Sequence, residues 1–475
     1  MSDITKTHLA VIGAGPGGYA AAFLAADLGL DVTVIDPEKN PGGVCLYRGC
    51  IPSKALLHVA KLINETREAK KWGITFASPD INVQQLRDWK NDVVKKLTGG
   101  LGQLIKQRKI NHIQGRAHFL DSNTIEIINE NSDKSRLQFD YAVLATGSRP
   151  AKIPALSVDS PRLLNSTSAL NLEDVPKSLL VIGGGYIGLE MGSVYAALGS
   201  KVSVVEMMPN ILPGADKDLI KILKKSLDEK FDKIMVNAKV TNMKALDDGI
   251  RVSFEGDDVH QNNQKFDKVL MSIGRQPNSD GLGLENTSVK TDQKGFVVVD
   301  DQRRTADPSI YAIGDIAGEP MLAHKASHEG HVAVEAIAGH KVAFEPQAIP
   351  AVVFTNPEMA WAGLTEEQAK QQGRNVEVMR FPWAASGRAL TMDRTDGLTK
   401  LIVDPETERI LGMGIVGAGA GELIAEGVLA IEMAANVTDL KLSIHPHPTL
   451  SETVMESAEM FFGQSTHIYR PRRKK

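Results

Sequence analysis

The alternation of apolar and polar positions predicts two copies of one strand–helix–strand unit. The first begins with an apolar strand at residues 8–12, passes through a glycine-rich turn into an alanine-rich helix that ends near Leu28, and closes with a strand that ends on Asp36. The second has the same order over residues 178–206 and ends on Glu206. In both units the same number of positions separates the first glycine from the acidic residue, so the chain repeats one structural device.

Each turn carries the spacing Gly-x-Gly-x-x-Gly, which suits the binding of a dinucleotide. The first glycine allows a tight turn, the second lets the backbone approach a pyrophosphate, and the third lets the helix pack closely on the strand. The helix N-terminus attracts the anion, and the acidic residue accepts hydrogen bonds from ribose hydroxyls. An isolated motif also occurs in ordinary turns, but two complete units favour two nucleotide sites. The glycines are Gly13, Gly15 and Gly18 in the first unit and Gly183, Gly185 and Gly188 in the second.

The acidic residue of the second unit favours NAD over NADP. Glu206 would repel a 2′-phosphate, and Met207-Met208-Pro209, which follow it, include no arginine that could bind one. A solvated acid at a strand end is the alternative interpretation of Glu206. Two nucleotide sites in one chain suggest one cofactor that stays bound and one that comes and goes.

Further patterns complete a mixed α/β chain. Apolar strands are predicted over residues 140–147, 234–240, 250–254, 265–274 and 310–315. Near Ile349-Pro350 the pattern changes to alternating strands such as 398–403, followed by a helix over 421–434. The pattern therefore predicts a mixed α/β chain whose C-terminal part, from about this point, forms a unit of its own.

The composition agrees with several compact domains and excludes some classes of function. A chain of 475 residues is long enough for about three domains. With 54 basic and 58 acidic side chains its formal charge is -4, which does not suit the coating of nucleic acid or of an anionic membrane. No apolar run reaches the length of a membrane span and the N-terminus lacks a signal-peptide pattern, so we expect a cytoplasmic protein. The basic C-terminal end is expected to be solvated, and it contains Arg470, Arg472, Arg473, Lys474 and Lys475.

The two cysteines, Cys45 and Cys50, lie close together in the sequence. So few cysteines exclude a disulfide scaffold and a four-cysteine zinc site. A helix is predicted to begin just after Cys50, where its dipole would stabilise a thiolate, with Lys54 one turn further on the same face. Gly49 would let the segment between the cysteines fold back for a bridge. Redox chemistry is favoured, while metal binding and two inert buried thiols are the alternatives.

Longer motifs give the chain a resemblance to a known family. The motifs are GGVCLYRGCIPSK at 42–54, ATG at 145–147, YAIGD at 311–315, MLAHKASHEG at 321–330 and IHPHPTLSE at 444–452. In these motifs and their order, essentially the whole chain resembles the flavin-dependent pyridine nucleotide–disulfide oxidoreductases. The resemblance implies an α/β fold with two Rossmann-like dinucleotide-binding domains and a C-terminal α+β dimerisation domain. The FAD-binding domain would span 1–150 and be completed by a central segment at 277–347, the NAD-binding domain would span 151–276, and the dimerisation domain would span 348–475.

The resemblance also implies roles for individual residues. Cys45 and Cys50 would form a redox-active disulfide, and His447, oriented by Glu452, would act on it as acid and base from the other subunit of a homodimer. Apart from the resemblance, Glu452 fits a helix cap with Thr449. The residues implied for FAD are Gly13, Gly15, Gly18, Asp36, Gly43, Lys54, Ala117, Gly147, Asp315 and Ala323. Those implied for NAD are Gly183, Gly185, Tyr186, Gly188, Glu190, Glu206, Val240 and Gly274, with Glu190 paired to Lys54; no metal site is implied.

Within this family, the motif at 444–452 and Glu206 resemble the members that oxidise dihydrolipoamide with NAD. The implied role is that of a shared component of 2-oxo acid dehydrogenase complexes. The implied partners are the lipoyl domains and core acyltransferase of such a complex, or protein H of the glycine cleavage system, and they include neither nucleic acid nor a membrane. One alternative is an NAD(P)H-dependent reductase of a small disulfide such as glutathione disulfide, which Tyr186 would suit. Another alternative is a flavoprotein that serves chiefly as a subunit or binding partner and does not use its redox chemistry.

Two positions between the cysteines depart from the family pattern. Tyr47 and Arg48 stand where an asparagine and a small aliphatic residue are usual. We expect the positive charge of Arg48 to favour the thiolate form of the cysteine pair.

Overall fold

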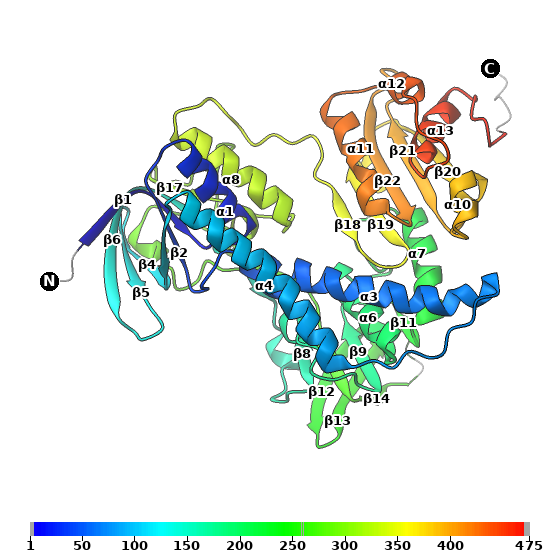
Figure 1. Ribbon diagram of the computed structural model, residues 1–475, viewed down its shortest axis with the longest axis horizontal. Coiled ribbons are helices and arrows are strands. Elements are labelled where there is room, and N and C mark those ends of the chain that lie inside the picture. The colour runs from blue at the N-terminus through cyan, green and yellow to red at the C-terminus, as the bar shows by residue number, and fades with distance from the viewer. Residues whose placement is uncertain (1–3, 258, 260, 470–475) are drawn as a thin grey trace.

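The computed structural model describes residues 4–257, 259 and 261–469, so the predicted basic end (Arg470, Arg472, Arg473, Lys474 and Lys475) lies outside the described residues. Figure 1 shows three lobes: a first lobe in blue and cyan with a yellow-green helix, a second lobe in green, and a C-terminal lobe in yellow to red. The colours show that the first lobe is built from two separate parts of the chain.

A mostly parallel sheet forms the core of the first lobe. Its strand order is β3-β2-β1-β6-β5-β4, and β17 pairs with β6. The predicted first unit is confirmed as β1, α1 and β2, and α1 packs against α8 on one face of the sheet (Figure 1). The bounds are β1 (Ile4–Ile12), α1 (Pro16–Asp27), β2 (Val32–Asp36), β3 (Asn111–Gln114), β4 (Arg116–Asp121), β5 (Thr124–Ile128), β6 (Lys134–Leu144), β17 (Ile310–Ala312), η4 (Gly314–Ala317) and α8 (Ala323–Ile337).

Helices fill the connection between β2 and β3. They are α2 (Gly43–Arg48), α3 (Cys50–Glu68), η1 (Ala69–Trp72) and α4 (Val83–Gln107). The predicted helix after Cys50 is confirmed, but the segment between the cysteines is itself a short helix. Gly49 joins the two helices because a Cβ there would lie 2.8 Å from the Val44 carbonyl oxygen. The glycine is needed for close approach of the backbone, not for a loop.

The second lobe contains a parallel sheet in the order β11-β10-β9-β15-β8 and an antiparallel sheet of β12, β13 and β14. The second strand–helix–strand unit is confirmed as β9, α6 and β10. The bounds are β8 (Leu163–Asn165), α5 (Ser166–Ala169), β9 (Ser178–Ile182), α6 (Tyr186–Leu198), β10 (Lys201–Val205), α7 (Lys217–Lys230), β11 (Lys233–Met235), β12 (Ala238–Leu246), β13 (Gly249–Gly256), β14 (Asn263–Phe266) and β15 (Lys268–Met271).

Two of the predicted strands are each divided in two, and the expected strand 310–315 ends earlier, at Ala312 of β17. The expected strand 234–240 is divided into β11 and β12, and the expected strand 265–274 is divided into β14 and β15. In both places the chain passes from one sheet to the other, so a single apolar run serves two sheets. Asn237, at a positive φ of 48°, makes the turn between β11 and β12.

The chain passes between the first and second lobes at a two-stranded antiparallel sheet of β7 (Ser148–Pro150) and β16 (Arg275–Pro277). Beyond β16, η3 (Leu284–Asn286) and β17 belong to the first lobe. We therefore propose domain boundaries near residues 150, 276 and 347, because the chain passes from one lobe to another at these points.

The C-terminal lobe is an antiparallel sheet in the order β18-β19-β22-β21-β20, and helices cover it (Figure 1). The expected strand at 398–403 and helix at 421–434 are confirmed as β21 and α11. The bounds are β18 (Ala351–Val353), β19 (Glu358–Gly363), α9 (Glu366–Gln371), β20 (Glu377–Pro382), α10 (Gly387–Thr391), β21 (Leu398–Val403), β22 (Ile410–Gly417), α11 (Ala420–Glu432), α12 (Val437–Leu442) and α13 (Glu452–Phe461). In the part of the chain that the structure describes, no helix combines the length and apolar character needed to cross a membrane.

Candidate active site

A cavity of about 890 Å³ opens between the first lobe and helix α6 of the second. Its wall contains both cysteines and nine of the ten residues expected for FAD. These are Gly13, Gly15, Asp36, Gly43, Lys54, Ala117, Gly147, Asp315 and Ala323, and they are joined by Tyr186 and Glu190 from α6. The volume is that of a site for a small molecule or cofactor.

Backbone without side chains lines this cavity at the first glycine turn. A Cβ on Gly13 would lie 2.4 Å from the Ala145 carbonyl oxygen, and one on Gly43 would lie 2.5 Å from the Cα of Gly15. The tenth expected residue, Gly18, lies behind the wall, where its Cβ would lie 1.9 Å from the Gly13 carbonyl oxygen. Side chains at these positions would fill the space, so the glycines leave a cradle that fits a pyrophosphate at the start of α1.

The acidic residues at the two strand ends have matching surroundings. Asp36 accepts hydrogen bonds from the backbone N–H groups of Ala14, at 2.7 Å, and Glu38, at 2.8 Å. Glu206 accepts them from Gly184 and Met208, both at 2.7 Å. Burial raises the pKa of Asp36. Each carboxylate is thus fixed at the edge of its glycine turn, with lone pairs left for a ribose.

The second turn repeats the close packing of the first. A Cβ on Gly183 would lie 2.5 Å from the Ser272 carbonyl oxygen, and one on Gly188 would lie 2.3 Å from the Gly183 carbonyl oxygen. Gly185 and Gly274 face open space. Val240 lies in β12 and is buried in the core of the second lobe, so its expected contact with NAD stays a prediction.

Cys45, in α2, and Cys50, the first residue of α3, are present as neighbouring thiols. The Cys45 thiol donates a hydrogen bond to the Cys50 sulfur, and this bond lowers the pKa of Cys50 from 9.0 to about 7; burial opposes this effect and Lys54 adds to it. The same bond, together with burial, raises the pKa of Cys45. Above about pH 7 the pair therefore holds one proton on Cys45 and leaves Cys50 as the thiolate.

Lys54 and Glu190 join the lobes beside the thiols. The ammonium donates hydrogen bonds to both carboxylate oxygens, at 3.1 and 2.8 Å. Lys54 comes from α3, one turn after Cys50, and Glu190 comes from α6 of the second lobe. The pairing that the resemblance implied is confirmed by these distances.

Arg48 has a different neighbour from the one expected. Its guanidinium pairs with Glu38, and the Tyr47 hydroxyl donates to the backbone oxygen of Asn40 at 3.0 Å. These contacts tie α2 to the segment that follows Asp36. The largest influences on the pKa of Cys50 are Cys45, burial and Lys54. Arg48 therefore belongs to the Asp36 end of the cavity.

His447 and Glu452 form a pair in the C-terminal lobe. The imidazole Nδ1 lies 2.9 Å from Glu452 Oε1, and the Thr449 N–H donates to Oε2 at 2.7 Å. Burial raises the pKa of Glu452, but the hydrogen bonds from Thr449 and His447 outweigh it, so the pKa is lowered. The hydrogen bond from the Thr449 N–H to Glu452 is one of the two bonds of the predicted helix cap. Glu452 therefore takes part in the cap and pairs with His447 at the same time.

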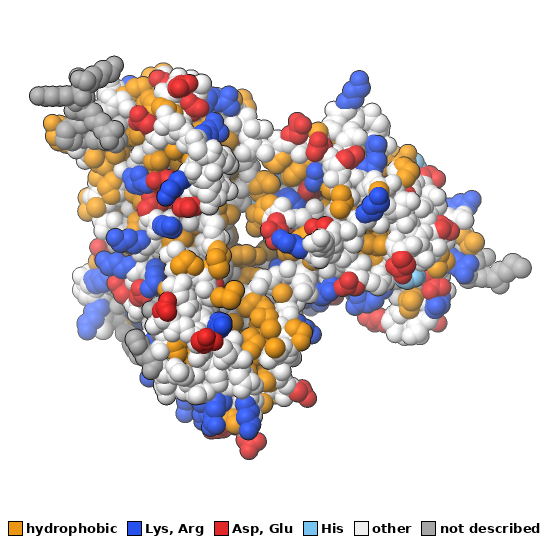
Figure 2. Space-filling view, turned by 180° about the vertical axis from the view of Figure 1, so that it is seen from behind, with side chains coloured by type: hydrophobic (Ala, Val, Ile, Leu, Met, Phe, Trp, Pro, Cys, Tyr) orange, Lys and Arg blue, Asp and Glu red, His pale blue; other side chains and the backbone are white. Residues whose placement is uncertain are grey.

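The His447 side chain is 73% exposed, and the cavity with the cysteines is lined only by residues between 12 and 326. Within one chain the imidazole is therefore not part of the cavity wall. Figure 2 shows the molecule hollowed between its lobes, with apolar side chains gathered where the lobes meet.

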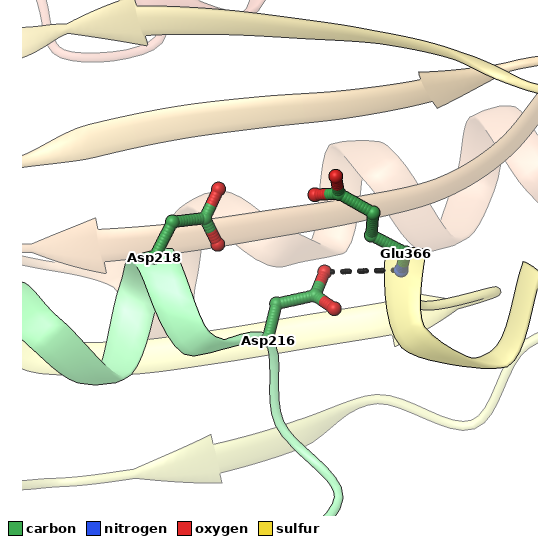
Figure 3. A group of neighbouring side chains, drawn as sticks. All are labelled: Asp216, Asp218 and Glu366. Atoms are coloured by element: carbon green, nitrogen blue, oxygen red, sulfur yellow. Dashed lines mark hydrogen bonds between the residues drawn. The ribbon is translucent and has the colours of Figure 1, made fainter. Parts of the chain in front are cut away.

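Three carboxylates meet at a different place, between the second and C-terminal lobes. Asp216 and Asp218 lie at the start of α7 and Glu366 begins α9, and their oxygens point toward one another (Figure 3). The buried Lys400 ammonium lies 2.8, 2.9 and 2.7 Å from them, and Arg380 pairs with Asp218 and Glu366. Two cations pair with three anions, so the cluster is an ion-pair network that joins the two lobes.

Replacing Lys400 with methionine is expected to lower the free energy of unfolding by about 3 kcal/mol, because it leaves the buried Asp216 carboxylate without its cation. Urea unfolding followed by fluorescence measures the change. Lys217→Met is the matched control, since Lys217 pairs with Glu367 at 3.8 Å on the surface and is 73% exposed. Equal losses in the two variants would contradict a stabilising role for the network.

Comparisons with known proteins agree with this geometry. Residues 7–330 match the family described as pyridine nucleotide-disulphide oxidoreductase, and residues 349–458 match the dimerisation domain of that family. The chain is 50% identical to the dihydrolipoyl dehydrogenase of Haemophilus influenzae over 98% of both chains, and 50% identical to that of Vibrio cholerae over 100% of both.

Solved structures are similar along nearly the whole chain. LpdA of Mycobacterium tuberculosis matches with a TM-score of 0.88 and 27% identity, over 96% of this chain and 99% of that one. The HOCl-induced flavoprotein disulfide reductase RclA of Escherichia coli, in its Cu(II) complex, matches with a TM-score of 0.86 and 27% identity, over 96% and 100%. With its two glycine cradles and its thiol pair, the chain belongs to the pyridine nucleotide-disulphide oxidoreductase family.

Proposed function

We propose that the chain is a dihydrolipoyl dehydrogenase, which oxidises protein-bound dihydrolipoamide to lipoamide and reduces NAD to NADH. The observation that carries this proposal is the unequal thiol pair: Cys50 has a lowered pKa and Cys45 a raised one, beside Lys54 and Glu190 in a cavity that both nucleotide-binding lobes contribute to. Relatives that are 50% identical over the full length carry the same name.

FAD and NAD, when bound, supply the acceptance and transfer of hydride. The first glycine cradle, Asp36, Lys54 and Asp315 would hold FAD, and the second cradle with Glu206 would hold NAD. Support comes from the space that the glycines leave and from the two capped carboxylates. Asp315 is itself positioned, because the Ser148 hydroxyl donates to it and Arg275 lies 4.0 Å away.

The thiol chemistry follows from the two pKa directions. In the oxidised enzyme a dihydrolipoamide thiolate attacks the Cys45 sulfur, and the Cys45–Cys50 bond breaks with Cys50 leaving as a thiolate. A lowered pKa makes Cys50 the better leaving group. The second substrate thiol, once deprotonated, then attacks the substrate sulfur bound to Cys45. This step releases lipoamide, and Cys45, whose pKa is raised, takes up a proton.

His447 is proposed as the base that removes the substrate protons and as the acid that returns one to Cys45. Glu452 would hold the ring and stabilise the imidazolium. Because His447 lies outside the cavity of its own chain, we propose that it acts on the cysteines of the partner subunit. The match of residues 349–458 to a dimerisation domain supports a homodimer. So do large exposed apolar side chains on this lobe, at Leu429, Met433, Leu442 and Ile444.

Lipoyl domains of a 2-oxo acid dehydrogenase complex, with its core acyltransferase, are the proposed partners. A lipoyl group is the substrate on which the Cys45–Cys50 pair would act, and the same group is carried by protein H of the glycine cleavage system. A place in the cytoplasm follows from this proposed role.

Steady-state assays test the function. We expect rapid reduction of NAD by dihydrolipoamide and slow oxidation of NADPH by glutathione disulfide. Anaerobic addition of dihydrolipoamide should also produce the long-wavelength charge-transfer band of a thiolate against oxidised flavin. Rapid glutathione reduction without that band would instead support the reductase that Tyr186 in the cavity wall suggests.

Arg48→Val is expected to weaken FAD binding about fivefold, since the partly exposed pair with Glu38 holds α2 against the segment after Asp36. The pH at which the Cys50 thiolate forms should not change. Equilibrium dialysis of FAD measures the first quantity and the charge-transfer band the second. If the pH at which the Cys50 thiolate forms shifts while FAD binding is unchanged, Arg48 instead favours the thiolate, as the sequence suggested.

A further inference from the structure

Phe354 lies where all three lobes meet. It follows β18 in the C-terminal lobe and packs against the core cluster that includes Leu56 of α3 and Leu189 of α6. Its backbone N–H donates a hydrogen bond to Glu190 Oε1 at 3.0 Å. The Lys54 ammonium nitrogen lies over its ring, 4.5 Å from the centroid. One residue of the C-terminal lobe therefore contacts both members of the ion pair beside the thiols.

These contacts compensate each partner of the pair for its lost hydration. The Glu190 side chain is only 3% exposed, and a buried carboxylate needs hydrogen-bond donors beyond its ion-pair partner. The Phe354 N–H is such a donor. The ring face attracts the ammonium and also limits the positions that a long, flexible lysine can adopt. Phe354 thus contacts Lys54 with its ring and Glu190 with its backbone.

The place of the Lys54 ammonium matters because opposite charges act on Cys50. Lys54 lowers the pKa of Cys50, whereas Glu190 raises it. An ammonium that moves away from Cys50 would leave the carboxylate as the nearer charge. The titratable groups that face Cys50 are Cys45 of α2, Lys54 of its own helix, Glu190 and Tyr186 of α6, and Tyr19 of α1.

We propose that Phe354 is a positioning residue, which fixes the Lys54 ammonium between Cys50 and Glu190 and so keeps Cys50 as the thiolate in the reduced enzyme. The inference rests on the proposed function, in which that thiolate faces the flavin. The C-terminal lobe would then act on the cysteines of its own chain through Phe354 and on those of the partner subunit through His447.

The test is a pH titration of the reduced holoenzyme. The enzyme is reduced anaerobically with dihydrolipoamide, and the long-wavelength charge-transfer absorbance is recorded from acid to alkaline pH. Because the pKa of Cys50 is lowered to about 7, the band is fully present at alkaline pH and is lost as the pH falls and the thiolate is protonated. In Phe354→Leu, which keeps the backbone N–H and removes the ring face, the midpoint should move upward by about half a pH unit. Phe354→Tyr, which keeps a ring face, should restore the midpoint of the unchanged enzyme.

Phe462→Leu is the matched control, because the Lys441 nitrogen lies 4.7 Å from the Phe462 centroid, away from the thiols. Its midpoint should not move. An unmoved midpoint in Phe354→Leu, or equal movement in Phe354→Tyr or Phe462→Leu, would overturn the role of Phe354 alone. If Phe354→Leu does not fold, Phe354→Met replaces it with the same expected shift. Absence of the band from the unchanged enzyme at every pH would overturn the proposed function, and with it this role.

Discussion

Replacing His447 with glutamine is expected to lower the turnover of dihydrolipoamide by about 10²- to 10⁴-fold, the contribution of a positioned acid–base group. Glutamine keeps a hydrogen bond to Glu452 but cannot accept the substrate proton. Stopped-flow reduction by dihydrolipoamide measures the loss directly. His445→Gln is the matched control, because His445 also pairs with a glutamate, Glu426, at 2.7 Å. We expect its turnover to stay within a few-fold of the unchanged enzyme.

The same variant tests whether the imidazole acts across the dimer. Hybrid dimers of His447→Gln and Cys50→Ser chains contain one site with intact cysteines and an intact histidine only if the two come from different subunits. Activity that reappears on mixing would therefore support action on the partner's cysteines. Mixtures as inactive as either parent would place the histidine and the cysteines of one chain in the same site.

Replacing Cys50 with serine is expected to abolish lipoamide chemistry, with a loss of about 10⁴-fold or more, as when a covalent nucleophile is removed. No disulfide can form, so the substrate has no electrophilic sulfur to attack. Oxidation of NADH by ferricyanide requires no thiol and should persist, which shows that the nucleotide sites remain intact.

Cys45→Ser should abolish lipoamide turnover equally but differ in its spectrum. The serine hydroxyl can still donate a hydrogen bond to Cys50, so the thiolate and its charge-transfer band should remain. Cys50→Ser should have no such band. A band in both variants, or in neither, would contradict the assignment of the thiolate to Cys50.

The sequence predicted well the features that depend on residues close together in the chain. The glycine turns and the acids at the strand ends depend on neighbours in sequence, so spacing alone located Gly13, Asp36, Gly183 and Glu206. The same holds for Cys50 at a helix start. Pattern could not divide 234–240 or 265–274, because an apolar run does not show which sheet each half joins.

Contacts between segments that are far apart in the sequence could not be predicted from the pattern of residues. Phe354 has no motif that links it to Lys54, and Lys400 stands in β21 as one lysine in a strand whose other residues, except Thr399, are apolar. A fully buried lysine is rare unless it is paired, so its apolar surroundings were the one available signal. The direction of Arg48 toward Glu38 depends on the short helix α2, which the sequence did not indicate.

The pairing of β7 with β16 shows that the second lobe is an insertion in the first. Pro150 lies opposite Arg275, so the two points where the inserted module begins and ends are neighbours. A two-residue hairpin turn can close that gap. The first lobe can thus be made continuous without the module, and a different nucleotide-binding module with adjacent ends can be placed on the same two strands. The choice of electron acceptor is nevertheless coupled to the thiol chemistry through one residue, because a replacement module would have to offer Lys54 the carboxylate that Glu190 now provides.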